Sequence, residues 1–415
     1  MPGSPAPHTA AAGGPAASSQ YIGRRSPAFR RAVAALFASG FSTFALLYYV
    51  QPLMPVFAKA FGVSPAASSL SLSATTALLA LAMLVASTLS DTFGRRALMV
   101  ASLLSSAALT LASVLFPQWS VLVAARALMG ITLSGLPAVA MAYVGEEIEP
   151  RSSGLAMGLY IGGSALGGMG GRLLAGLIAD VADWHAATLA IGALGFVGAA
   201  LFWRLLPPPR NFRPRPLQLR LALRGFGGNL SDPVLRRLFA QAFLLMGAFV
   251  AVYNYIGYRL LAPPFGMSQA VVGLVSAVYL GGIFSSAWMG NLGARLGHHR
   301  VMWAGVALEL AGLAMTLSDS LAMVVGGLAV LTFGFFGAHS ICSAWVARRA
   351  GSGRAQASAL YLFCYYAGSS AVGYAGGIAL SLGQWPGLAA LLGVLLAAGL
   401  ANALFLARRA SAPAR

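Results

Sequence analysis

The short polar segment SDTFGRR at residues 90–96 separates two long apolar runs, 66–88 and 97–115. Each run has about 20 residues, the length that an α-helix needs to cross the hydrocarbon core of a bilayer. Because the interruption is so short, the two helices must be antiparallel neighbours, with the polar segment on one side of the membrane. These residues therefore predict a transmembrane hairpin.

The composition extends this prediction to the whole chain. Charged residues make up 9% of the sequence and hydrophobic residues 58%, whereas soluble domains carry about 25% charged residues. A chain with so few charges cannot cover a globular surface, so we expect an integral membrane protein. Its apolar runs are continuous rather than alternating, which favours spanning helices over a β-barrel.

The formal net charge is +18, which in a soluble protein would suggest nucleic-acid binding. Here the basic residues concentrate in segments on one side of the predicted topology. The exceptions are Lys59 and Arg259 on the other side, and Arg126 and Arg172 inside spans. This bias follows the positive-inside rule and makes the basic side cytoplasmic, so the lipid bilayer, not nucleic acid, is the partner that the charge distribution indicates.

Twelve apolar spans account for the sequence, and an even number places both termini in the cytoplasm. They are 31–56, 66–88, 97–115, 119–143, 154–178, 185–206, 236–260, 269–290, 301–317, 321–346, 355–380 and 387–407. We therefore predict an all-α membrane protein of two six-helix bundles. Its segments are a disordered cytoplasmic N-terminal arm (1–30), a six-helix bundle (31–206), a basic cytoplasmic linker with an amphipathic stretch (207–235), a second six-helix bundle (236–407) and a cytoplasmic tail (408–415).

An internal repeat relates the two halves. In the fifth span, the pattern YxGxSxxGxxGG begins at Tyr160, and in the eleventh span the same pattern begins at Tyr366. The sequence FGVS at 61–64 likewise returns as FGMS at 265–268, each directly before a span. Internal repeats of this kind are typical of transporters built from two homologous bundles.

With this architecture, segment 89–96 (LSDTFGRR) resembles the signature loop between helices 2 and 3 of the major facilitator superfamily of transporters. Leu89, Asp91, Gly94, Arg95 and Arg96 match that loop, and the resemblance covers nearly the whole chain. More narrowly, the chain is similar to the bacterial drug- and sugar-efflux branch and to inner-membrane transporters of the YnfM type. The segments YVQP (49–52), SLSLS (69–73), YNYIGY (253–258) and AHS (338–340) carry that similarity.

The resemblance implies a cytoplasmic gate formed by Asp91, Gly94, Arg95 and Arg96. Gly94 permits a tight turn, and in the family this aspartate pairs with the loop arginines and faces the start of helix 11, holding the two bundles together. The alternative is an ordinary hairpin loop that only follows the positive-inside rule.

Candidate substrate-binding residues lie in the first and seventh spans, which line the cavity in the resembling family, and in the fourth and eleventh spans. They are Tyr48, Gln51, Arg126, Asn254, Tyr258, Tyr361 and Tyr365. Aromatic walls with a few hydrogen-bonding groups suit an amphipathic organic molecule, although some of these tyrosines could be packing residues. Arg126 begins a sequence that resembles the family's RxxxG element, and it should face the cavity or another polar group, because an unpaired arginine in a membrane is costly. The alternative is that Arg126 snorkels to the periplasmic face. We expect Arg172, near the end of its span, to snorkel to the surface.

Proton coupling needs a group that titrates inside the membrane. Glu309 is the acid that falls within a span, and His339 lies on the tenth span, which lines the cavity in the resembling family. We rank His339 above Glu309 because histidine has an unperturbed pKa near 6.5. The glycine-rich element at 158–167 is similar to the antiporter element of helix 5, but it lacks that element's proline.

The predicted function is proton-linked efflux of small organic or drug-like molecules by alternating access, in the bacterial inner membrane. Uptake or facilitated transport of a sugar or organic anion is the alternative. No metal-binding cluster, nucleophile–base–acid set or phosphate-binding loop is visible in the sequence, so we expect no enzyme activity, cofactor or metal. We expect a monomer, with protons as the coupling ion.

Overall fold

The computed structural model describes residues 21–214 and 226–411, and this part of the chain is almost entirely helical. The elements are α1 (Pro27–Tyr48), α2 (Val50–Phe61), α3 (Pro65–Phe93), α4 (Arg95–Ala112), α5 (Trp119–Leu133), α6 (Pro137–Glu147), α7 (Pro150–Val181), α8 (Trp184–Leu205), α10 (Pro233–Leu261), α11 (Gln269–Leu274), the 3₁₀ turn η1 (Val275–Val278), α12 (Tyr279–Leu296), α13 (His298–Met315), α14 (Leu321–Arg349), the 3₁₀ turn η2 (Gly351–Gly353) and α15 (Arg354–Ser411).

Nine helical segments in the described residues are long and apolar enough to cross a membrane. Three further features bring the structure into line with the predicted count of twelve. The helix α15 is two helices joined at a kink, where Gly383 and Gln384 leave the helical conformation. The helix α13 is 18 residues long, and α5 and α6 together form one further segment. The all-α membrane fold is thus confirmed.

Some predicted spans are interrupted helices. The first span is expected to be continuous, but the chain breaks between α1 and α2 at Tyr49, three residues before Pro52. Proline lacks the N–H that would continue the helical ladder, and α2 contains a second proline, Pro55. The fourth span is interrupted in the same way before Pro137, where α6 begins.

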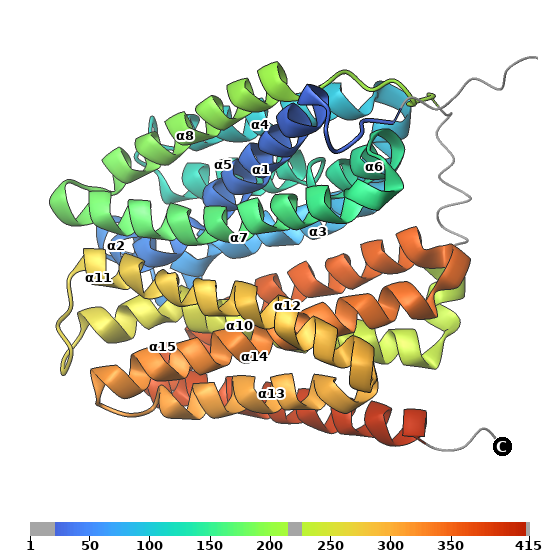
Figure 1. Ribbon diagram of the computed structural model, residues 1–415. Coiled ribbons are helices and arrows are strands. Elements are labelled where there is room, and N and C mark those ends of the chain that lie inside the picture. The colour runs from blue at the N-terminus through green and yellow to red at the C-terminus, as the bar shows by residue number, and fades with distance from the viewer. Residues whose placement is uncertain (1–20, 215–225, 412–415) are drawn as a thin grey trace, which may run out of the picture.

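The two halves of the sequence form two adjacent stacks of helices (Figure 1), with α1–α8 in one and α10–α15 in the other. The repeated glycines explain the close packing inside each stack. A β-carbon on Gly163 would lie 2.5 Å from the carbonyl oxygen of Phe37, so α7 can approach α1 only with glycine there. Gly368 meets the Phe243 carbonyl on α10 in the same way. The repeat is therefore a repeat of close helix contacts.

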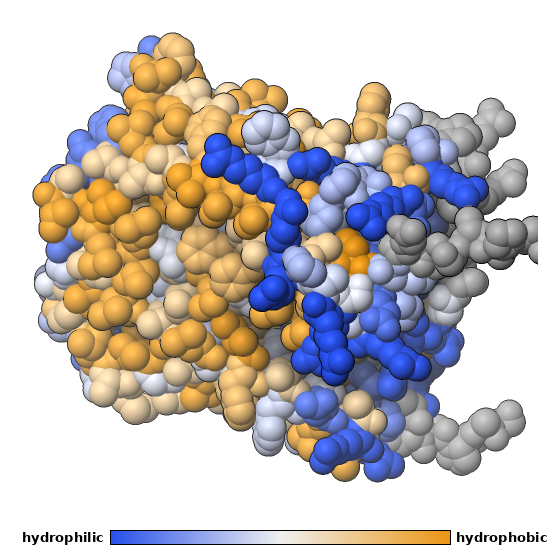
Figure 2. All heavy atoms as spheres, turned by 45° about the horizontal axis from the view of Figure 1, so that its top comes forward, coloured by the Kyte–Doolittle hydropathy of each residue, from blue (hydrophilic) through white to orange (hydrophobic). Residues whose placement is uncertain are grey.

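The surface carries a broad apolar belt, and hydrophilic residues gather at one end of the molecule (Figure 2). We call this the basic end; it contains the α3–α4, α12–α13 and α14–α15 connections and the described residues between α8 and α10. The opposite, or far, end contains the α2–α3, α7–α8 and α10–α11 connections. Exposed large hydrophobic residues such as Leu81, Val197 and Val394 lie between the two ends, as expected for a protein surrounded by lipid.

The structure differs from the expected disordered arm at 1–30. Residues 1–20 lie outside the described part, but the following segment is ordered because it joins the bundle. The Ile22 N–H donates to the Glu147 carbonyl at 2.8 Å, and Ser26 caps α1 by accepting from the Phe29 N–H. In the expected linker, the amphipathic stretch falls on residues 215–225, outside the described residues. Of the expected tail 408–415, residues up to Ser411 belong to α15.

Candidate functional site

The predicted gate loop is shorter than expected, because α3 continues to Phe93 and only Gly94 separates it from α4. Gly94 has φ 94°, a conformation that glycine adopts readily. The Arg95 guanidinium lies 2.6 Å from Asp91 and 2.7 Å from Glu146, so it joins the loop to the end of α6. Arg96 donates to the Trp203 carbonyl on α8.

These contacts of the gate loop stay inside the N-terminal half. The expected contact between Asp91 and the start of helix 11, which begins at Arg354, is not among the ion pairs of the described residues; Asp91 pairs there with Arg95. Sequence reasoning missed Glu146, which sits outside the loop pattern. In this structure the ion pairs of the loop join α3, α4 and α6 within the N-terminal half.

Arg126 is buried in the N-terminal half and bound by backbone carbonyls. Its guanidinium donates to Leu46 at 2.8 Å and Leu47 at 2.7 Å, in the last turn of α1, and to Ser71 on α3 at 2.6 Å. A cation is favourable at the carboxyl end of a helix, where carbonyls lack intrahelical partners. Arg126 therefore has polar partners, as the sequence predicted. These partners are backbone carbonyls, two of them beside the break between α1 and α2.

Hydrogen bonds join the two halves at the far end. Gln51 donates from Nε2 to Asn254 Oδ1 at 2.7 Å, and the Tyr258 hydroxyl is 2.7 Å from the Ser68 hydroxyl and donates to the Met54 carbonyl. Gln269 joins α11 to α2 and α7, through its side chain to the Pro52 carbonyl and its backbone N–H to Asp180. We call this set of contacts the far-end interface.

Arg172 on α7 lies at the centre of the far-end interface. Its Nε donates to Gln51 Oε1 at 2.5 Å and its Nη1 to the Gly168 carbonyl at 2.6 Å. Three tyrosine rings surround the guanidinium carbon, with centroids 4.5, 4.6 and 5.6 Å away for Tyr48, Tyr279 and Tyr253. One arginine thus connects an amide network that crosses between the halves to an aromatic enclosure built from both.

The expectation that Arg172 snorkels was wrong, because the side chain is only 3% exposed. The helix runs nine residues beyond it to Val181, which places Arg172 about 14 Å from the helix end at 1.5 Å per residue. The internal repeat held a signal for this position. The repeated pattern is followed by Arg172 in the first half but by Ile378 in the second, and Ile378 is exposed.

Aromatic rings continue from Arg172 into the C-terminal half. Tyr279 contacts Phe249 at 5.6 Å between centroids, Phe249 stacks on Phe335 at 3.8 Å, and Phe335 stacks on His339 at 5.8 Å. Tyr365 lies 4.8 Å from the His339 ring. We call Tyr279, Phe249, Phe335, His339, Tyr361 and Tyr365 the aromatic wall; it unites three predicted residues with three that sequence reasoning had not selected.

The two candidate proton-coupling residues occupy different surroundings. His339 is partly exposed on the aromatic wall, and its Nδ1 is 2.8 Å from the Tyr361 hydroxyl. Glu309 on α13 is fully buried, and neither of its carboxyl oxygens has a hydrogen-bond partner in the described residues. The structure brings His339 together with predicted substrate-binding residues, whereas Glu309 packs where α13 meets Gly334 of α14.

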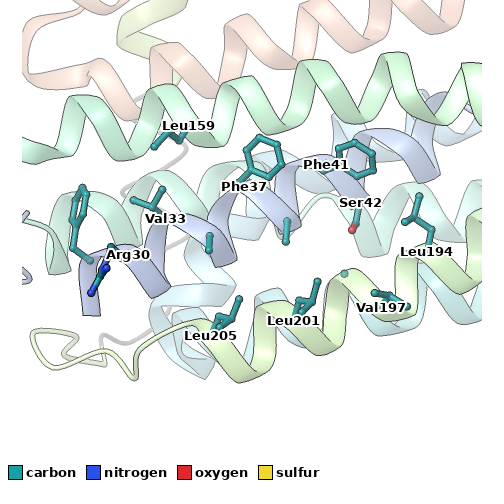
Figure 3. A pocket seen from close by; sticks show the side chains of 14 residues that line it. Arg30, Val33, Phe37, Phe41, Ser42, Leu159, Leu194, Val197, Leu201 and Leu205 are labelled. Atoms are coloured by element: carbon teal, nitrogen blue, oxygen red, sulfur yellow. The ribbon is translucent and has the colours of Figure 1, made fainter. Parts of the chain in front are cut away.

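One hollow in the described residues lies away from the far-end interface. A groove of about 740 Å³ is lined by side chains of α1, α7 and α8, among them Phe37, Phe41, Leu159 and Leu201, with Arg30 toward one end (Figure 3). All its lining residues come from the N-terminal half and nearly all are apolar, so it suits lipid chains. Beside Arg172, by contrast, the hollow measures only about 10 Å³. No cluster of three or more potential metal ligands occurs within the described residues.

Comparison with known proteins shows which family has this sequence and architecture. Residues 34–263 match the model of the Major Facilitator Superfamily. The chain is 44% identical over 393 residues to the uncharacterized MFS-type transporter YybF of Bacillus subtilis, covering 95% of this chain and 97% of YybF. It is 43% identical over 377 residues to the inner membrane transport protein YnfM of Escherichia coli, covering 91% and 90%. The crystal structure of a bacterial homologue of the human lysosomal transporter Spinster, inward-facing and unoccupied, superposes with a TM-score of 0.76 at 15% identity, over 92% of this chain and 97% of that one.

Proposed function

This chain belongs to the Major Facilitator Superfamily, and on that premise we propose that it exports small organic or drug-like molecules by alternating access, driven by protons. The family resemblance made from the sequence is thus confirmed, and the protein is a multi-pass membrane transporter. Export, proton coupling and the nature of the substrate are our proposals.

The observation that carries the proposal is the far-end interface. The Gln51–Asn254 and Ser68–Tyr258 hydrogen bonds tie the two halves together at one end of the molecule, whereas the ion pairs of the gate loop at the basic end stay within one half. Two bundles closed at one end are the arrangement that rocking about a central site requires. We therefore infer that this structure is closed at the far end.

In this proposal the substrate-binding residues are Tyr48, Gln51, Asn254, Tyr258, Tyr361 and Tyr365, together with Arg172. Arg126 leaves the substrate-binding set, because its guanidinium is already occupied by three carbonyls. Asp91, Gly94, Arg95 and Arg96 form the gate at the basic end, where the Arg95–Glu146 ion pair would be rearranged when that end closes.

We place the basic end and both termini in the cytoplasm of a bacterial cell, in the inner membrane, by the positive-inside rule. A reporter that is active only in the periplasm should be active when fused after Pro264, between α10 and α11. The same reporter should be inactive when fused after Arg213, between α8 and α10. The reverse pattern of activity would refute this orientation.

Proton coupling gives the second test. The wild type is reconstituted in proteoliposomes with an imposed pH gradient and given a panel of labelled organic molecules. It should move the transported molecules against their own concentration gradients. His339→Gln should reduce transport driven by the pH gradient tenfold or more, because the titrating group is lost. Exchange of substrate without a pH gradient should continue. Glu309→Gln is the matched variant, since it also replaces one titratable side chain of a membrane-spanning helix with an amide.

The outcomes separate the candidates. Loss of coupling in Glu309→Gln but not in His339→Gln would reverse our ranking. A wild type that ignores the pH gradient altogether would contradict proton coupling and favour facilitated transport of a sugar or organic anion, the second candidate, which the buried Arg172 supports.

A further inference from the structure

Arg172 differs from the other buried arginines in how its charge is compensated. Arg126 donates to three carbonyl oxygens, and Arg95 contacts two carboxylates. Arg172 donates to one amide oxygen, of Gln51, and to one carbonyl of its own helix. It takes part in none of the ion pairs of the described residues, and no hydrogen bond from its Nη2 is present there. A buried charge in a membrane normally has a partner, so Arg172 has capacity for an anion.

Three tyrosine rings lie close to the Arg172 guanidinium. Tyr48, Tyr279 and Tyr253 lie 4.5–5.6 Å from the guanidinium carbon, a distance at which aromatic rings attract a cation. Nitrogens at the guanidinium edge then remain for hydrogen bonds. A carboxylate is the planar group that this edge binds with two parallel hydrogen bonds.

We propose that Arg172 binds the anionic group of the substrate, an amphipathic organic anion such as an aromatic carboxylate, whose apolar body lies against the aromatic wall. This inference rests on the proposed transport function and names its substrate class. The rings from Tyr279 through Phe249 to Phe335 and His339 supply the apolar surface, and the tyrosine hydroxyls among them can meet polar substituents.

The same geometry connects substrate binding to gating. Gln51 holds Arg172 with its oxygen and Asn254 with its nitrogen. A carboxylate that replaces the Gln51 oxygen on Arg172 removes one of the two bonds that orient this amide, and so weakens the tie between the halves. The hollow beside Arg172 is about 10 Å³, room for about one water molecule, so an anion reaches Arg172 only when the neighbouring side chains move.

The test uses the full-length protein in lipid nanodiscs and probes that differ only in charge. These are benzoate, benzamide and benzylammonium, with the corresponding naphthalene series for a larger ring. Binding is measured by the shift in melting temperature over a concentration series. We expect the carboxylate in at least one ring series to bind the wild type ten- to a hundredfold more tightly than its neutral and cationic counterparts, the range for a charged hydrogen-bonded pair.

Arg172→Gln should remove this preference while leaving the weak binding of the amide probe unchanged, and Arg172→Lys should retain part of it. Arg300→Gln, at an exposed arginine of the basic end, is the matched control and should bind like the wild type. Equal binding of carboxylate and amide in both ring series, or unchanged carboxylate binding in Arg172→Gln, overturns the anion site.

Flux measurements on the same panel separate this inference from the proposed function. Transport of neutral or cationic probes, with no role for Arg172, would contradict the anion site and leave the proposed export function intact. Arg172-dependent carboxylate binding without flux of any bound probe would contradict the proposed export of such molecules and leave the anion site intact.

Discussion

Replacing Gly176 with valine should reduce transport by about a hundredfold or more while the protein still inserts and folds. A β-carbon at this position would lie 2.7 Å from the Gly273 α-carbon and 2.9 Å from the Gln269 carbonyl oxygen. Both are backbone atoms of α11, so they cannot yield by rotation of a side chain. The valine therefore prevents α7 and α11 from meeting, and the far end cannot close. Flux in proteoliposomes measures the loss.

Labelling shows which state the variant adopts. Ser276, only 2% exposed, is changed to cysteine in a background where Cys342 and Cys364 are replaced by serine. A membrane-impermeant maleimide should label this cysteine from the far side faster when Gly176 is valine. Gly158→Val is the matched control on the same helix, because a β-carbon there meets no atom within 4 Å. Equal transport by the two valine variants would contradict the closure that we infer.

Arg126→Ala should destabilise the protein itself. Removing the guanidinium leaves carbonyls of Leu46, Leu47 and Ser71 without this donor in a buried site. At about 1 kcal/mol or more for each unsatisfied group, the expected loss is roughly 3 kcal/mol of unfolding free energy. The yield of monodisperse protein and its melting temperature measure this effect.

Two further variants distinguish a structural from a substrate-binding role of Arg126. Arg126→Lys should restore part of the stability, since lysine keeps the charge but not the planar set of donors. Arg151→Ala, at an exposed arginine, should leave stability unchanged. An Arg126→Ala protein of normal stability that has lost only substrate binding would return Arg126 to the substrate site.

The sequence was sufficient for the architecture because the signals for it are local. Apolar runs of membrane length, one polar interruption at Gly94 and the repeated glycines after Tyr160 and Tyr366 each have a direct structural meaning. The break at Tyr49 escaped prediction, although Pro52 and Pro55 follow it closely, because prolines can also be accommodated within transmembrane helices.

The candidate site was less predictable, because burial inside a membrane protein depends on the partner helix. The position of Arg172 along its helix suggested access to the surface, yet α11, about a hundred residues later in the chain, packs through Gly273 against Gly176 and covers that face. Backbone carbonyls that receive Arg126 have no sequence signature at all. The hydrogen bond between Gln51 and Asn254 could not be predicted from the sequence, because it depends on how the two halves pack against each other.

The central claim, that the far end closes and opens during transport, is tested by one distance. Val181 and Leu382 are 86% and 85% exposed and belong to the far ends of the two halves. Each position is changed to cysteine in the background without Cys342 and Cys364, and a spin label is attached to it. Pulsed electron paramagnetic resonance then measures the distance between the two labels. We predict that the resting protein shows a population with a short distance between the two labels. This distance should become longer in Gly176→Val, and also in the wild type when the pH is changed or a carboxylate probe is added. One unchanged distance distribution under all these conditions would contradict alternating access at this interface.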